Sequence, residues 1–199
     1  MRSVFVISLA LLAMLPAQML TSAQALTAGR NATGVAAEEP ATRLNQLFAD
    51  LKRAGDERGA ERVSNRIRQQ WARSGSASID LLMQWAQKAI DEQKNDVAFD
   101  FLDQVVLLAP AYAEGWNRRA TLHFAMDDYS KAMADIVRTL ELEPRHFGAL
   151  GGMAVILRNE GRNQAAIHAY QRLLDVYPML REAQTELGKL ADEVAGQGI

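Results

Sequence analysis

The chain has 199 residues, with 22 basic and 24 acidic side chains, three histidines and no cysteine. The absence of cysteine excludes disulfides, thiol nucleophiles and thiolate metal sites. The slightly acidic balance excludes a strongly basic nucleic-acid-binding protein on composition alone, so we expect no nucleic acid among the partners.

The N-terminus has the three parts of a secretory signal. A basic start, Met1-Arg2, precedes 12 apolar residues from Val4 to Leu15, and Ala23-Gln24-Ala25 forms an A-x-A cleavage site. The alternative is a membrane helix, but about 20 apolar residues are needed to cross a bilayer. We therefore expect residues 1–25 to be a cleaved signal peptide and the mature protein to lie in a bacterial periplasm, without stable membrane insertion. Residues 26–42 are expected to be a disordered leader, because they contain few large apolar side chains.

Two helices are predicted next. Leu44, Leu47, Phe48 and Leu51 lie at i, i+3, i+4 and i+7, which is the spacing of one apolar helix face. A second apolar stripe, formed by Val63, Ile67 and Trp71, follows it. We interpret residues 43–78 as an N-terminal helical cap, a degenerate helix pair, because terminal units of repeat stacks are commonly atypical.

The rest of the chain repeats with one period. The three prolines Pro110, Pro144 and Pro178 stand 34 residues apart, and small and large apolar residues between them recur at the same interval. The small positions are Ala86, Ala120 and Ala154 in one series and Ala98, Ala132 and Ala166 in another; the large ones include Leu102, Ile136 and Tyr170. The predicted helix pairs are 79–92 with 95–108, 113–126 with 129–142, and 147–160 with 163–176.

This period, with its small positions, large anchors and closing proline, resembles the tetratricopeptide repeat (TPR). The resemblance implies an all-α fold, a TPR α-solenoid of antiparallel helix pairs with N-terminal and C-terminal capping helices. Repeats are predicted over 79–112, 113–146 and 147–180, and residues 181–199 are predicted to form a C-terminal cap helix and tail.

Two departures from the family pattern stand out. Arg119 occupies a position where the repeat normally buries leucine, and Asp135 lies one helix later, a combination that some TPRs carry. We expect a structural ion pair, because a lone buried arginine costs several kcal/mol; a ligand-binding role for Arg119 is the alternative. The second departure is Gly148, Gly151 and Gly152 in one helix, where each glycine costs about 1 kcal/mol relative to alanine. Either the helices pack closely there, or the glycines form a shallow floor for a partner.

The resemblance also implies that the first helix of each pair lines a concave groove. Asn117 and Arg118 lie at its middle and can hydrogen-bond a peptide backbone or pair with an acidic side chain. The positions of the family's carboxylate clamp hold Met83, Gln87, Arg118, Gly148 and Gly152, so that clamp is absent. The candidate partner-binding residues are Gln84, Gln87, Asn117, Arg118, Thr121, Gly148, Gly151, Gly152 and Val155.

Little in the sequence indicates catalysis. The three histidines, His123, His146 and His168, are not placed on one face at metal-ligand spacing, and there is no nucleophile elbow, phosphate loop or dinucleotide-binding motif. We therefore expect no metal, no cofactor and no enzyme activity. The chain resembles small exported TPR proteins of alphaproteobacteria, which implies a periplasmic adaptor or scaffold that binds an envelope protein or an extended peptide and supports envelope integrity. The alternative is an accessory subunit of a cell-envelope enzyme, or such an enzyme itself. The sequence leaves open whether the concave or the convex face binds.

Overall fold

The structure, a computed structural model, describes residues 41–196. The chain divides into two units, residues 1–42 and 43–199, and the account below concerns the second. The predicted signal peptide and most of the predicted leader lie outside the described residues. The first described helix, residues 41–53, includes residues 41 and 42, so the leader prediction extended two residues too far at its C-terminal end.

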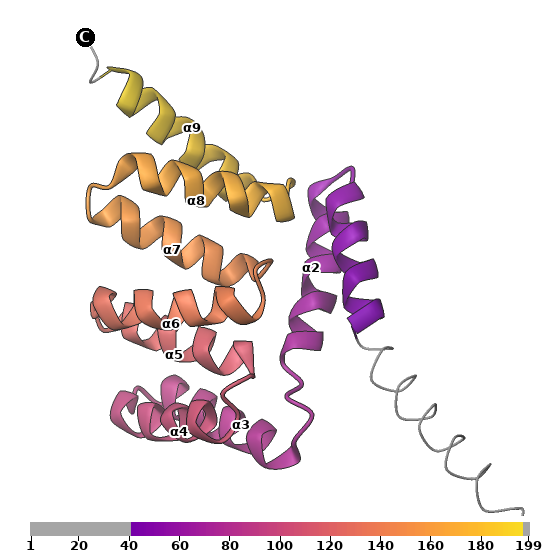
Figure 1. Cartoon of the computed structure of the whole chain (residues 1–199), viewed down its shortest axis with the longest axis vertical. Helices are drawn as coiled ribbons and strands as arrows, with labels where there is room; N and C mark the ends of the chain where they lie inside the picture. Colours follow the sequence, from indigo (N-terminus) through magenta and orange to yellow (C-terminus); the bar gives the residue numbers. More distant parts are fainter. Residues whose placement is uncertain (1–40, 197–199) are drawn as a thin grey trace, which may run out of the picture. The chain divides into compact units, whose positions relative to one another are not determined.

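The described residues form helices and no strand, which confirms the predicted all-α fold (Figure 1). The helices predicted from the 34-residue period agree with the observed ones to within two residues at every end. After the helix over residues 41–53 come α2 (Glu57–Trp71), α3 (Ala77–Asp91), α4 (Asn95–Leu108), α5 (Ala113–Ala125), α6 (Tyr129–Leu142), α7 (Phe147–Asn159), α8 (Asn163–Val176) and α9 (Arg181–Gly196).

The turns of the solenoid repeat as regularly as its helices. Each repeat ends at its proline, which cannot continue a helix because its ring clashes with the preceding turn and its nitrogen carries no proton. The turn inside each repeat contains a residue with a left-handed backbone: Gln93 (φ 60°), Asp127 (φ 60°) and Gly161 (φ 71°), each 34 residues from the next. Only glycine adopts this conformation without steric cost, so the first two turns hold a small strain that the third does not.

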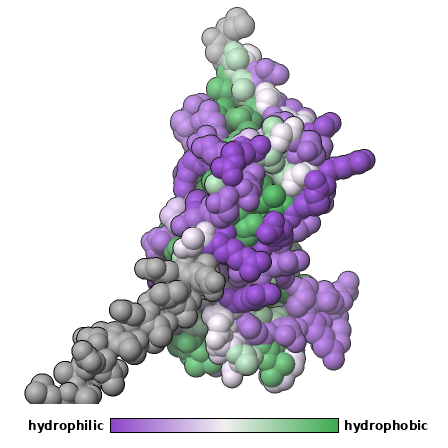
Figure 2. All heavy atoms as spheres, turned by 90° about the vertical axis from the view of Figure 1, so that its right-hand side faces the viewer, coloured by the Kyte–Doolittle hydropathy of each residue, from purple (hydrophilic) through white to green (hydrophobic). Residues whose placement is uncertain are grey.

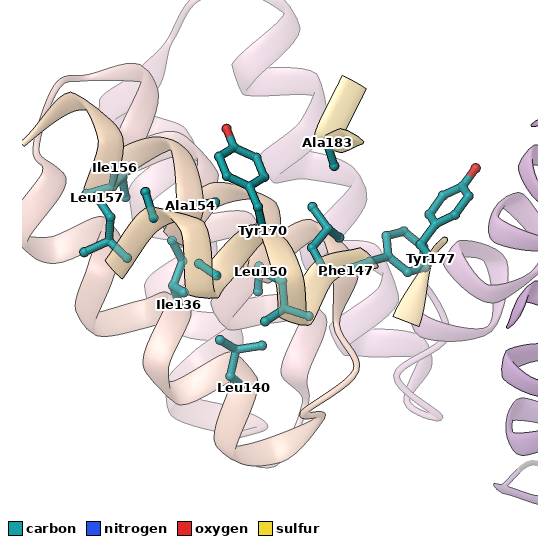
Figure 3. Close-up of a cluster of buried hydrophobic side chains, with 14 of the residues drawn as sticks. Ile136, Leu140, Phe147, Leu150, Ala154, Ile156, Leu157, Tyr170, Tyr177 and Ala183 are labelled. Atoms are coloured by element: carbon teal, nitrogen blue, oxygen red, sulfur yellow. The ribbon is translucent and has the colours of Figure 1, made fainter. Parts of the chain in front are cut away.

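Helix pairs pack through the small residues that the period predicted. Ala86, Ala98, Ala120, Ala132, Ala154 and Ala166 are all at most 2% exposed, and their lack of bulk allows the two helices of a pair to approach closely. Larger side chains fill the space between neighbouring helices. Figure 3 shows Ile136 and Leu140 of α6, Leu150 of α7 and Tyr170 of α8 in one continuous cluster.

The N-terminal helix pair packs differently from the cap that we predicted. Its buried residues Leu47, Phe48 and Ile67 belong to the same cluster as Phe147 and Tyr177 of the third repeat, whereas the first repeat has a core cluster of its own. Two polar contacts reinforce this placement. Arg145 donates to Asn45 at 2.8 Å, and Arg181 pairs with Glu57 at 3.1 Å. The pair therefore covers the turns that flank the third repeat and does not continue the stack at its N-terminal end.

This placement leaves apolar side chains of the first repeat in contact with solvent. Leu81 and Trp85 of α3 are 42% and 45% exposed, and Leu108 of α4 is 63% exposed. Figure 2 shows hydrophobic side chains gathered at its lower end, where α3 and α4 lie in Figure 1. No described helix is both long and apolar enough to cross a membrane.

Candidate functional site

Two neighbouring cavities lie on the face formed by the first helices of the repeats, and we call them together the groove. The α5–α7 cavity has a volume of about 260 Å³ and the α7–α9 cavity about 280 Å³. Gly148, Gly152 and Val155 of α7 line both. The α5–α7 cavity is also lined by Asn117, Ala120, Thr121, Phe124, Ile136 and Ala149. The α7–α9 cavity is also lined by Arg68, Phe147, Gly151, Tyr170, Leu173, Tyr177, Leu180, Glu182 and Ala183.

The structure brings most of the predicted groove residues together. Asn117 and Thr121 join the shared residues of α7 in one cavity, and Gly151 joins them in the other. Gln84, Gln87 and Arg118 line neither cavity. The walls that sequence reasoning missed come from α2, α8 and α9, because the contact of the N-terminal pair with the third repeat was not foreseen.

Arg118 is already bound within the protein. Its Nε donates to Glu114 Oε1 at 2.9 Å, and its Nη1 donates to Gln87. Asn117 donates to Glu114 Oε2 at 3.1 Å. The two side chains expected to bind a partner are therefore largely occupied by Glu114. The i, i+4 spacing of Glu114 and Arg118 on one helix was the sequence feature that could have predicted this pair.

His146 connects three helices beneath the groove. It is 2% exposed and caps α7, since its Nδ1 accepts the backbone N–H of Ala149 at 3.1 Å. The neutral ring therefore carries its proton on Nε2, which donates to Glu114 Oε2 at 3.1 Å. One face of the ring stacks on Trp71, with the ring centroids 4.1 Å apart. The sequence placed His146 in a turn but gave no indication of these partners.

Glu114 keeps its charge although it is buried. Burial opposes ionisation, but hydrogen bonds from His146 and Arg118 outweigh it, so the pKa of the Glu114 carboxyl lies below its ordinary value. The carboxylate holds the start of α7 and the middle of α5 in register.

Glu114→Gln is expected to lower the free energy of unfolding at pH 7 by about 1–3 kcal/mol, because it removes the charged acceptor of three hydrogen bonds. A depressed folded-state pKa contributes stability that is complete above the unfolded value of about 4.3 and is lost as the pH falls through the folded value. The difference between wild type and variant, measured by urea unfolding, should therefore shrink between pH 7 and pH 3. An equal difference at both pH values would contradict this role.

The three glycines of α7 differ in the space around them. A Cβ at Gly152 would lie 3.2 Å from Ile136 Cδ1, which is too close without a shift of that side chain. At Gly151 the nearest atom is Leu173 Cδ2 at 3.8 Å, an ordinary contact. Close packing therefore accounts for Gly152, whereas Gly151 leaves unfilled space at the wall of the α7–α9 cavity.

Gly151→Ala should accordingly raise the free energy of unfolding by up to about 1 kcal/mol, the usual gain in a helix interior. Gly188→Ala in α9 is the matched control, because nothing lies within 4 Å of a Cβ there. Both variants should shift the urea midpoint upward. A loss of stability confined to Gly151→Ala would show that this glycine is needed for packing.

Comparison with known proteins identifies the family. No protein-family model matches the chain. A TPR repeat-containing protein of Rhizobium etli is 53% identical over 161 residues, which cover 81% of this chain and 79% of that protein. The chain belongs to the TPR repeat-containing proteins.

Solved TPR structures share the fold at low sequence identity. The first TPR of Spaghetti (RPAP3), bound to the HSP90 peptide SRMEEVD, superposes with a TM-score of 0.56 at 21% identity and covers 59% of this chain and 93% of that one. A crystal structure of MamA also has a TM-score of 0.56, at 19% identity, covering 71% of this chain and 80% of that one.

The ion pair expected from the TPR pattern is present on the opposite side of the stack from the groove. Arg119 donates from Nε and Nη2 to the two carboxylate oxygens of Asp135, both at 2.8 Å, and from Nη1 to Asp103 at 2.7 Å. Asp135 is 4% exposed. The guanidinium also lies over the ring of Trp116, 4.9 Å from its centroid. These contacts engage Arg119 on every side, which favours its structural interpretation over ligand binding.

A third cavity, about 600 Å³ in volume, borders this pair between α4, α5 and α6. His123 lines it, and burial lowers the pKa of that imidazole. His168 lies apart on α8, next to Gln171. Within residues 41–196, no group of three or more His, Cys, Asp or Glu side chains is arranged to hold a metal ion.

Proposed function

We propose that this chain is a periplasmic protein-interaction module of the TPR family, an adaptor or scaffold that binds a protein or extended peptide of the cell envelope through the groove. The observation that carries the proposal is the pair of small cavities on either side of α7. Each is smaller than the about 300–1,000 Å³ of small-molecule sites, so single side chains of a partner fit them better than a cofactor. A binding role without catalysis and without a cofactor follows from this shape.

Structural relatives support a peptide as the partner. The TPR of Spaghetti carries a bound HSP90 peptide that ends in acidic residues. The clamp positions of this chain hold Met83, Gln87, Gly148 and Gly152 with Arg118, and Arg118 is paired with Glu114. The partner is therefore expected to differ in charge from those acidic tails.

The proposed location rests on the N-terminal sequence. Residues 1–25 have the composition of a cleavable signal, and export would bring the TPR unit into contact with envelope proteins. The mature protein in a periplasmic extract should begin at Leu26 when its N-terminus is sequenced. A full-length product retained in the membrane would contradict both the location and the adaptor role.

The binding role is tested by filling the groove. Thr121→Trp on α5 and Gly151→Leu on α7 add bulk at positions that line the two cavities. Gly188→Leu makes the same glycine-to-leucine change in the helix α9, in open space. After chemical crosslinking in cells, the two groove variants should recover less of the partner than wild type, and Gly188→Leu should recover the same amount. Unchanged recovery by folded groove variants would direct attention to the second helices or the N-terminal pair.

A further inference from the structure

The two cavities of the groove are arranged as a pair. They lie on opposite sides of α7 and meet over Gly148 and Gly152, where no side chain separates them. Each has an apolar lining, with Phe124 and Ile136 in one and Leu173 and Tyr177 in the other. Volumes of about 260 and 280 Å³ each accommodate one large apolar side chain.

The charges around the groove are balanced. Arg118 is paired with Glu114, and Arg158 of α7 is paired with Glu186 of α9. The α7–α9 cavity has one cation and one carboxylate in its lining, Arg68 of α2 and Glu182 of α9. Arg68 lies over the Phe147 ring, 5.1 Å from its centroid, and donates to the neutral Asn65. A charge-neutral segment complements this surface, since its backbone offers carbonyls to Arg68 and N–H groups to Glu182.

The spacing of the cavities restricts the sequence of that segment. Cavities on the two sides of one helix are separated by about one interhelical distance, about 8–10 Å. Two side chains at i and i+2 of a β-strand are only about 6.6 Å apart. In a polyproline II segment the side chains at i and i+3 point the same way and lie about 9 Å apart.

We infer that the groove holds a charge-neutral, extended segment with two large apolar side chains at i and i+3, one in each cavity, whose backbone crosses the glycines of α7. This inference rests on the proposed function and adds the chemistry of the partner to it. The N-terminal pair then contributes directly to binding, because Arg68 forms part of one anchor cavity.

A peptide library gives a direct test. Phage-displayed random dodecapeptides are selected on the purified protein and counter-selected on a variant with both Thr121→Trp and Gly151→Leu. Selected sequences are resynthesised with blocked ends and a fluorophore, and their dissociation constants are measured by fluorescence anisotropy. We expect apolar pairs at i and i+3 without a requirement for acidic residues or a free C-terminal carboxylate.

The single variants assign one anchor to each cavity. Thr121→Trp and Gly151→Leu should each weaken binding of a selected peptide about tenfold or more, the effect of losing the burial of one large apolar side chain. Replacing one anchor of the peptide by alanine should weaken binding to wild type similarly, but should have little further effect on the variant whose matching cavity is filled. Gly188→Leu should bind as wild type.

Several outcomes would overturn the inference. These are selection of no peptide, selection of apolar pairs at another spacing, dependence on a C-terminal carboxylate, and equal binding by the filled variants. A partner that crosslinks to the groove in cells but lacks the two anchors would leave the proposed function standing and refute only the two-anchor arrangement.

Discussion

Arg119→Leu is expected to lower the free energy of unfolding by about 3 kcal/mol, because it leaves the buried Asp135 carboxylate without its bidentate partner. Asp135→Leu should cost less, since Arg119 then keeps Asp103 at 2.7 Å and its contact with Trp116. The double variant should regain much of the stability lost in Arg119→Leu, as apolar replacements of buried ion pairs commonly do.

A double-mutant cycle measured by urea unfolding isolates the coupling between the two side chains. Asp103→Ala is the control, because the Asp103 side chain is 60% exposed and a surface ion pair contributes at most about 1 kcal/mol. Additive effects of the Arg119 and Asp135 substitutions would refute a structural pair and restore the ligand-binding interpretation of Arg119.

Trp71→Ala is expected to cost about 3 kcal/mol, the lower end of the range for large aromatic side chains in cores. Trp71 contacts three aromatic rings, with centroid distances of 4.1 Å to His146, 4.8 Å to Phe147 and 5.8 Å to Phe48. Its loss should release the N-terminal pair from the third repeat. Hydrogen–deuterium exchange should then accelerate over residues 43–71, more than over α3 and α4.

Trp85→Ala on α3 is the matched control. Trp85 is 45% exposed and contacts one ring, that of Phe101, at 5.5 Å, so its replacement should cost about 1 kcal/mol or less. Exchange that rises equally throughout the chain in Trp71→Ala would mean that the pair and the repeats unfold together, contrary to a separable clasp.

The period predicted the repeats well because each turn of the stack imposes the same local requirements. A small residue is needed where two helices touch, as at Ala132, and a proline where a pair ends, as at Pro144. These requirements act within about 34 residues, so they are legible in the sequence alone.

The position of the N-terminal pair could not be predicted in the same way. The stripe of Leu47, Phe48 and Leu51 shows that one helix face is buried, but the hydrophobic effect is not directional and does not specify the surface that covers it. The contact of Trp71 with His146 joins residues that belong to different periods of the pattern. The α7–α9 cavity depends on that contact, so half of the groove was absent from the sequence prediction.

The charge of the groove was also misjudged. Arg118 was expected to offer a free guanidinium, whereas Glu114, one turn earlier on α5, neutralises it. The predicted glycine floor lies between the two cavities, and only the structure separates Gly152, which is needed for packing, from Gly151, which is not.

Site-specific photocrosslinking tests most directly whether the groove is the binding surface. A benzophenone amino acid is placed at Thr121, which lines the α5–α7 cavity, or at Ala134, which lines the cavity beside Arg119 and Asp135. Both positions are exposed on helices, so both variants should fold. After irradiation of living cells, the proposal predicts a covalent adduct of one protein at Thr121 and none at Ala134. An adduct at Ala134 without one at Thr121 would contradict it.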